Sequence, residues 1–135
     1  MNDWNASIIA EFRANGGRVG GRFAASTLLL LHTTGARSGQ ERVNPVAYQD
    51  LGHGRVAVFA SFGGQDVDPA WFRNLVAHPD VRVEVGDETR DVRARVAAGD
   101  ERTAIWERQK AEHPGFAGYE TRTSREIPVV VLEPR

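Results

Sequence analysis

The sequence contains no cysteine, and this absence excludes disulfide bonds and thiolate chemistry. It also lacks any apolar run approaching the roughly 20 residues of a membrane-spanning helix. The formal net charge is only −1, so no overall positive charge attracts the chain to nucleic acid or to an anionic membrane. The N-terminus, Met1 to Trp4, lacks a basic region followed by an apolar one, so we expect a cytoplasmic protein without a signal peptide.

Motifs of several common catalytic centres are absent as well. The four histidines are scattered along the chain, and no pair has the spacing of metal ligands, so we expect no metal site. No serine lies in a GxSxG turn, which leaves a hydrolase without specific support. The GxGxxG fingerprint and the strand–helix–strand alternation of a Rossmann fold are also missing.

The pattern of apolar residues predicts six strands and about three helices in one domain, residues 1–135. The N-terminal helix, within residues 1–15, has apolar residues every four positions. Its apolar face could touch a membrane surface, but we favour docking on or beside the rest of the domain. The helices are predicted over residues 4–14, 69–78 and 101–112, the last one capped by Asp100. The strands are predicted over residues 27–33, 42–49, 55–61, 81–85, 89–96 and 127–132.

The order of these elements indicates the class of fold. Most strands follow one another directly, with turn residues at Asp50–Gly54 and at Gly86-Asp87, which favours antiparallel pairing. Short strands with helices set apart are typical of an α+β protein. We therefore predict a small, mainly antiparallel, six-stranded barrel with flanking helices.

The loop over residues 33–40, which reads TTGARSGQ, is the strongest candidate for a binding site. Glycines allow backbone N–H groups to gather around an anion, and the Arg37 guanidinium can bind phosphate through two hydrogen bonds. Residues 11–42 hold five arginines against two glutamates, which is either a solvated basic face or a surface for an anionic ligand. The loop therefore predicts a phosphate site.

Two later segments could complete such a site. Ser61-Phe62-Gly63-Gly64 follows a predicted strand and would let the backbone approach a ligand closely. The segment 69–74 begins a predicted helix, whose first N–H groups could bind an anion or a ring oxygen. Trp71 could form a wall for an aromatic cofactor, although packing in the core is the more common role of such a residue.

The run from Leu30 to Val46, LLHTTGARSGQERVNPV, resembles the signature of the deazaflavin (F420)-dependent nitroreductase family, of the F420H2-dependent quinone reductase type. Further motifs agree in order over nearly the whole chain: ANGGRVGG (14–21), ASFGG (60–64), PAWFRNL (69–75) and IPVVV (127–131). The resemblance implies a split β-barrel that binds coenzyme F420, a deazaflavin with a phosphate and an oligoglutamate tail. The implied activity is hydride transfer from F420H2 to a small organic acceptor, namely a quinone, an enone or a nitroaromatic.

The same resemblance implies the site residues. Ser61 and Tyr119 are the candidate catalytic residues, as proton donors, and His113, Phe116 and Tyr119 would form the substrate pocket. In nitroreducing members this late segment is rich in tyrosine, whereas here one tyrosine remains, so a quinone or enone is at least as plausible an acceptor. The implied cofactor-binding residues are Ala36, Arg37, Ser38, Gly39, Gln40, Arg42, Asn44, Pro45, Val46, Val58, Phe59, Ala60, Ser61, Phe62, Pro69, Ala70, Trp71 and Asn74.

Two other functions fit the same motifs. A related barrel binds FMN, so a flavin-using oxidoreductase is one alternative. A non-catalytic protein that carries or sequesters F420 is the other, because hydride transfer needs no essential protein nucleophile that could be missing. In each case we expect a small-molecule partner and no nucleic acid, and a monomer or weak homodimer. Peripheral membrane contact through the N-terminal helix stays open.

Overall fold

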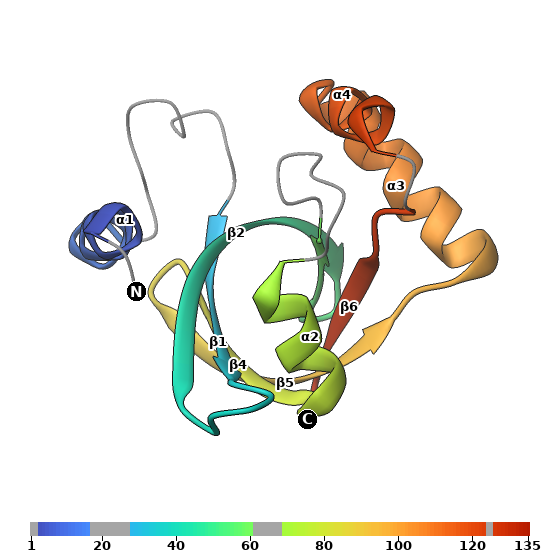
Figure 1. The fold of residues 1–135 in the computed structure, drawn as a ribbon. Helices are drawn as coiled ribbons and strands as arrows, with labels where there is room; N and C mark the ends of the chain where they lie inside the picture. The colour runs from blue at the N-terminus through green and yellow to red at the C-terminus, as the bar shows by residue number, and fades with distance from the viewer. Residues whose placement is uncertain (1–2, 17–27, 61–68, 124–125) are drawn as a thin grey trace.

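A computed structural model of the chain describes residues 3–16, 28–60, 69–123 and 126–135, without the side chains of residues 3–5. Six strands close into a barrel in the order β1-β2-β3-β6-β5-β4, and every neighbouring pair is antiparallel (Figure 1). This confirms the predicted α+β barrel. The strands are β1 (Leu28–Thr34), β2 (Glu41–Gly52), β3 (Arg55–Phe59), β4 (Asp80–Val85), β5 (Glu88–Val96) and β6 (Val129–Pro134).

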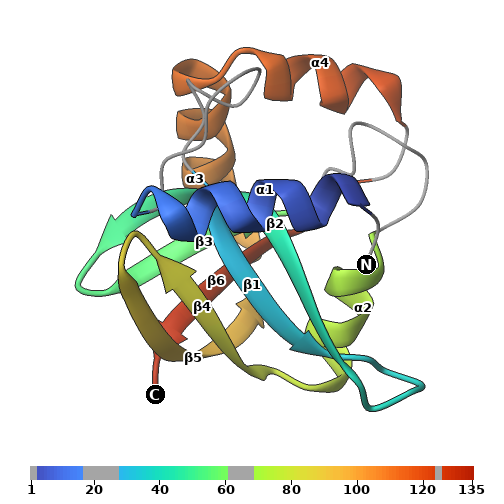
Figure 2. The same cartoon turned by 90° about the vertical axis from the view of Figure 1, so that its left-hand side faces the viewer.

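The strand β1 is apolar at four consecutive positions because both of its faces are covered. Leu29 and Leu31 belong to the barrel core and are 0% exposed, whereas Leu30 packs outside the barrel against Ile9 and Phe12 of α1 (Asp3–Ala14). Each fully buried leucine contributes roughly 1.5–3 kcal/mol relative to an exposed one. Figure 2 shows α1 crossing the outer side of β1 and β2, where Ile9 and Phe12 pack on Leu30.

A polar contact supplements this docking near the end of α1. Arg13 Nε and Nη2 donate to the two carboxylate oxygens of Glu84 at 3.1 and 2.7 Å. Glu84 Oε2 also lies 2.6 Å from His32 Nε2. The hydrogen bond from Arg13 is the main cause that holds the pKa of Glu84 below its usual value, with His32 adding to it. The contact therefore ties α1 to β4 through a carboxylate that stays ionised.

The strand β2 is longer than predicted because it serves two neighbours in turn. Residues 41–47 pair with β1, and residues 48–52 pair with β3, with a register shift between Asp50 and Gly52. Side chains alternate along it, so Val46 packs inside the barrel, while Val43 lies under α1 and Gln49 contacts α3 (Gly99–Glu112). The strand β2 thus contacts α1 near its beginning and α3 near its end.

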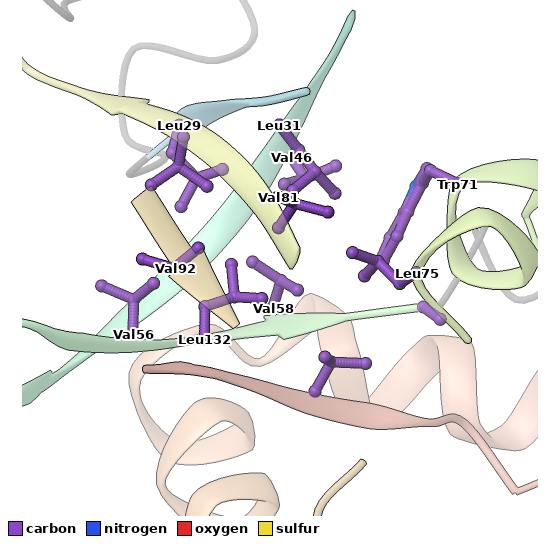
Figure 3. Packing of buried hydrophobic residues seen from close by; sticks show 13 residues of the cluster. Leu29, Leu31, Val46, Val56, Val58, Trp71, Leu75, Val81, Val92 and Leu132 are labelled. Atoms are coloured by element: carbon purple, nitrogen blue, oxygen red, sulfur yellow. The ribbon is translucent and has the colours of Figure 1, made fainter. Parts of the chain in front are cut away.

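The helix α2 (Ala70–Ala77) covers one end of the barrel. It begins after Pro69, which has the extended backbone suited to a helix N-cap position. Figure 3 shows Trp71 and Leu75 directed from α2 toward Val46 and Val81 of the barrel core. Two apolar side chains one helical turn apart therefore close the barrel end.

The helices α3 and α4 (Gly115–Arg122) cover the outer face of β3 and β6. Two sequence predictions need correction here. Ala98 occupies the N-cap of α3, and Asp100 lies in the first turn, where its charge still favours the helix dipole. The segment after Pro114, where no helix was predicted, forms a fourth helix. Its two glycines gave no helical signal, because glycine has a low helix propensity.

Candidate functional site

The loop between β1 and β2, residues 35–40, satisfies much of its own hydrogen bonding. Gly35 N–H donates to the Gln40 carbonyl at 2.8 Å, and Gly39 N–H donates to the Gly35 carbonyl at 2.9 Å. Gln40 N–H donates to Ser38 Oγ at 3.2 Å. Among the described residues, this leaves the N–H groups of Arg37 and Ser38 without a partner, together with the Ser38 hydroxyl proton. The donors available to an anion therefore gather at two positions at the tip of the loop.

Both glycines of this loop are needed for its shape. Gly39 has φ +71°, a left-handed conformation that a side chain disfavours. A Cβ atom on Gly35 would lie 2.6 Å from Ser38 Oγ, which is closer than van der Waals contact allows. The TTGARSGQ sequence therefore encodes a compact turn, and its glycines serve folding as well as access for a ligand.

Asn74 of α2 fixes this loop to the barrel. Its Oδ1 accepts the Ala36 N–H at 3.0 Å, and its Nδ2 donates to Thr33 Oγ1 of β1 at 3.2 Å. Asn74 is 8% exposed and Thr33 is 2% exposed, so both bonds lie away from bulk water. Both amide atoms of Asn74 are occupied by the protein. The residue predicted to bind the cofactor thus holds the loop that carries Arg37.

Two exposed arginines, Arg37 and Arg42, lie beside the loop. Among the described residues, their guanidinium groups have no ion pair, hydrogen bond or ring contact. Several other arginines are paired, such as Arg93 with Asp80 at 2.7 Å and Arg95 with Glu101 and Glu133. Arg42 lies opposite Thr33 in the sheet, so both side chains share the face on which Asn74 sits. In the described part of the chain, this end of the barrel therefore carries positive charge without a carboxylate partner.

The strand residues predicted to bind the cofactor divide between two faces of the sheet. Asn44, Pro45 and Val46 are consecutive in β2, so Pro45 faces outward and its neighbours face the interior. In β3, Val58 packs in the barrel core, whereas Phe59 packs outside it, and both are buried. Their side chains cannot line one common surface.

Of the remaining predicted residues, Ala60 follows β3 and is buried in the barrel core, and the others lie around the first turn of α2 or outside the described residues. Trp71 is 9% exposed and packs in the barrel core, as its alternative interpretation proposed. Pro69 is buried and Ala70 is exposed at the start of the helix, which has no acidic side chain in its first turn. Ser61 and Phe62 lie outside the described residues.

The residues predicted to form the substrate pocket meet in one group, which we call the aromatic cluster: Phe59, Trp106, His113, Phe116 and Tyr119. Phe116 lies at its centre, 5.5 Å from Phe59, 6.1 Å from Trp106 and 5.2 Å from Tyr119 between ring centroids. These pairs are tilted or edge-on, which is the favourable arrangement for aromatic rings. Arg122 lies 5.7 Å above the Tyr119 ring. Trp106 was not among the predicted site residues.

No helix among the described residues is both long and apolar enough to cross a membrane. Over the same residues, no group of three or more histidine or acidic side chains is placed to hold a metal ion.

Comparisons with known proteins agree with one another. The sequence profile of a family described as F420H(2)-dependent quinone reductase matches residues 4–134. An F420H(2)-dependent quinone reductase of Mycobacterium tuberculosis is 40% identical over 130 residues, which cover 93% of this chain and 87% of that protein. A solved structure of an F420-H2 dependent reductase has a TM-score of 0.71 at 38% identity, covering 78% of this chain and 93% of that one. Another, described as a domain-swapped dimer, has a TM-score of 0.74 at 35% identity, covering 97% and 98%.

Proposed function

The chain belongs to the F420H(2)-dependent quinone reductase family, and from this premise we propose that its two-ended site reduces a quinone or a related activated acceptor. Coenzyme F420 is the cofactor, and when bound and reduced it supplies the hydride. The protein's task is then to bind the cofactor, to orient the acceptor and to provide a proton.

The observation that carries the proposal is the positive charge beside the 35–40 loop, which has no partner among the described residues. The guanidinium groups of Arg37 and Arg42, the N–H groups of Arg37 and Ser38 and the Ser38 hydroxyl are all donors that the described residues leave available. A phosphate and a chain of carboxylates present only acceptors, so this donor set fits the charged part of F420. A neutral ligand would gain little from two exposed cations.

The aromatic cluster, which we propose as the acceptor end of the site, suits a flat acceptor. None of the residues of α4 is buried, so Phe116 and Tyr119 keep part of their ring surfaces accessible while their edges pack on the cluster. Such a surface could stack on a planar quinone ring. The Tyr119 hydroxyl is our candidate donor of the proton to the reduced acceptor, with Ser61 as the second candidate.

Titration of F420 fluorescence with the wild-type protein and with Arg37→Ala tests the cofactor site. A charge-assisted hydrogen bond contributes about 1.5–3 kcal/mol, and the exposure of Arg37 favours the lower end of that range, so we expect about tenfold weaker binding. The control is Arg90→Ala, which removes an arginine that pairs with Glu88 in the β4–β5 hairpin at 2.8 Å. Equal affinity in all three proteins would refute the phosphate assignment.

Oxidation of F420H2 with a panel of quinones, enones and nitroaromatics tests the acceptor class. We expect turnover with quinones and enones and little with bulky nitroaromatics. Binding of F420 without any turnover would favour a carrier. Parallel titration with FMN separates the flavin alternative, which requires tight FMN binding and no F420 binding.

The chain is also proposed to be a monomer or weak homodimer. A structure 35% identical over nearly the whole chain is described as a domain-swapped dimer, which supports examining dimerisation. Light scattering over a range of protein concentrations would measure the state directly.

A further inference from the structure

The helix α4 is attached to the domain differently from the other helices. α2 buries Trp71, Asn74 and Leu75, whereas α4 buries none of its residues. Its apolar contacts are ring edges, with Phe116 against Phe59 and Trp106. Edge contacts between partly exposed rings allow a helix to shift by small amounts, because no side chain is enclosed in a matching cavity. The orientation of α4 therefore depends on its polar contacts.

Among the described residues, the carboxylate of Glu120 makes polar contacts between α4 and α3. Trp106 Nε1–H donates to Glu120 Oε2, and Lys110 Nζ lies 3.5 Å from Glu120 Oε1. Trp106 and Lys110 are four residues apart and so share a face of α3, toward which Glu120 points from α4. Trp106 is 2% exposed, so its indole N–H needs a protein acceptor, and Glu120 provides it. Hydrogen bonding to Glu107 and, secondarily, the charge of Glu120 raise the pKa of Lys110, which keeps it cationic.

We propose that Glu120 is a positioning residue that fixes α4, and through it Phe116 and Tyr119, at the acceptor end of the site. Glu120 does not contact the acceptor. It sets the distance between the Tyr119 ring and the barrel wall at Phe59, so it determines which acceptors fit. This inference rests on the proposed function, in which the aromatic cluster receives the acceptor.

The chain offers a matched set of variants. Glu120→Ala removes both contacts between the helices. Glu120→Gln keeps an oxygen that can accept the indole N–H but removes the charge, so it should rescue most of the effect. Glu107→Ala is the control, because Glu107 pairs with the same Lys110 at 3.0 Å but belongs to α3. It perturbs the same cation without touching α4.

Hydrogen exchange tests the attachment without cofactor or substrate. We expect the amides of residues 116–122 to exchange about tenfold faster in Glu120→Ala than in the wild type, while the amides of α3 keep their rates. The exchange rates of α4 in Glu120→Gln should lie close to those of the wild type, and the rates in Glu107→Ala should equal those of the wild type. Unchanged exchange of α4 in Glu120→Ala would overturn the proposal whatever the enzyme does.

Steady-state kinetics with benzoquinone and a bulkier naphthoquinone test the effect on the acceptor. In Glu120→Ala we expect the KM for the naphthoquinone to rise about tenfold and kcat to fall as well, because Tyr119 moves with α4, while the Kd for F420 stays within about twofold of the wild type. Faster exchange of α4 with an unchanged KM would show that Glu120 holds the helix without positioning the acceptor, and would overturn the assignment. If the wild type bound no F420 or reduced no quinone, the proposed function would fail, and the exchange result alone would decide the attachment.

Discussion

Substitution of Asn74 by alanine should separate the positioning of the 35–40 loop from general stability. Asn74 is the buried side chain that joins α2 to both the loop and β1, through its bonds to Ala36 N–H and Thr33 Oγ1. Alanine removes both bonds and keeps the helix, because alanine has the highest helix propensity. The expected outcome is a folded protein whose loop is free to move.

The size of the effect follows from these two bonds. Each contributes about 1 kcal/mol to folding, so the free energy of unfolding should fall by about 2 kcal/mol. For a chain of 135 residues this lowers Tm by about 7 °C. If binding of F420 must reorder about one loop residue, the cost is about 1–2 kcal/mol, which weakens the Kd about 5- to 30-fold.

Gln49 provides a matched control at another place on the barrel. It is also a buried amide, 4% exposed, and its Nε2 donates to the Ile105 carbonyl at 3.1 Å and to Gln109 Oε1 at 3.2 Å. Gln49→Ala should lower Tm by a similar amount, since it too removes two buried bonds. It should leave the affinity for F420 unchanged, because its contacts tie β2 to α3 and not to the loop.

Scanning calorimetry measures the change in Tm, and F420 fluorescence titration at 20 °C, where each variant is folded, measures the change in affinity. Wild-type affinity in Asn74→Ala would refute the idea that this residue holds the loop for binding. Equal loss of affinity in Asn74→Ala and Gln49→Ala would assign the loss to general destabilisation.

Three more measurements follow from the structure. Arg13 lowers the pKa of Glu84 below its usual 4.5, so the folded state gains stability above about pH 4.5. This stability is lost as the pH falls through the folded-state pKa of Glu84. When Tm is measured at decreasing pH, it should therefore fall less in Arg13→Ala than in the wild type. Gly39→Ala should lower the free energy of unfolding, measured in urea, by about 1–2 kcal/mol, since Gly39 has φ +71° and no atom lies near its Cβ position. Gly35→Ala should also weaken F420 binding, because its Cβ would meet Ser38 Oγ and distort the loop. Equal F420 affinity in the two variants would contradict this role of the contact with Ser38. Tyr119→Phe should lower kcat at least about tenfold with an unchanged Kd for F420, and an unchanged kcat would assign the proton to another donor.

The strands and the barrel could be predicted from the sequence because period-two alternation and turn residues are local signals. The β4–β5 hairpin has alternating residues on both sides of Gly86-Asp87, and its register is regular from Asp80 to Val85. The four leucines of β1 indicated a strand buried on both faces, and α1 supplies the second cover. Hydrophobic pattern alone decides these elements.

Features that depend on tertiary contacts could not be predicted in the same way. The helix α4 contains two glycines and buries no residue, so neither propensity nor periodicity marks it. Trp106 lies within the helix predicted over residues 101–112, but its place in the aromatic cluster depends on where α4 lies. A tryptophan in the helix before an aromatic segment was the signal that could have suggested this contact.

The structure differs most from the sequence-based prediction in how the 35–40 loop would hold an anion. The sequence suggested that glycine-bearing backbone would surround the phosphate, but Gly35, Gly39 and Gln40 direct their N–H groups to acceptors within the loop. Loops in which the backbone is the main donor to a phosphate leave such groups free. Here the remaining attraction comes mainly from side-chain charge, which salt screens more strongly than buried backbone hydrogen bonds. Selectivity for the cofactor then depends on how firmly the turn is fixed to α2, since an arginine at the tip of a mobile loop would bind many anions equally well.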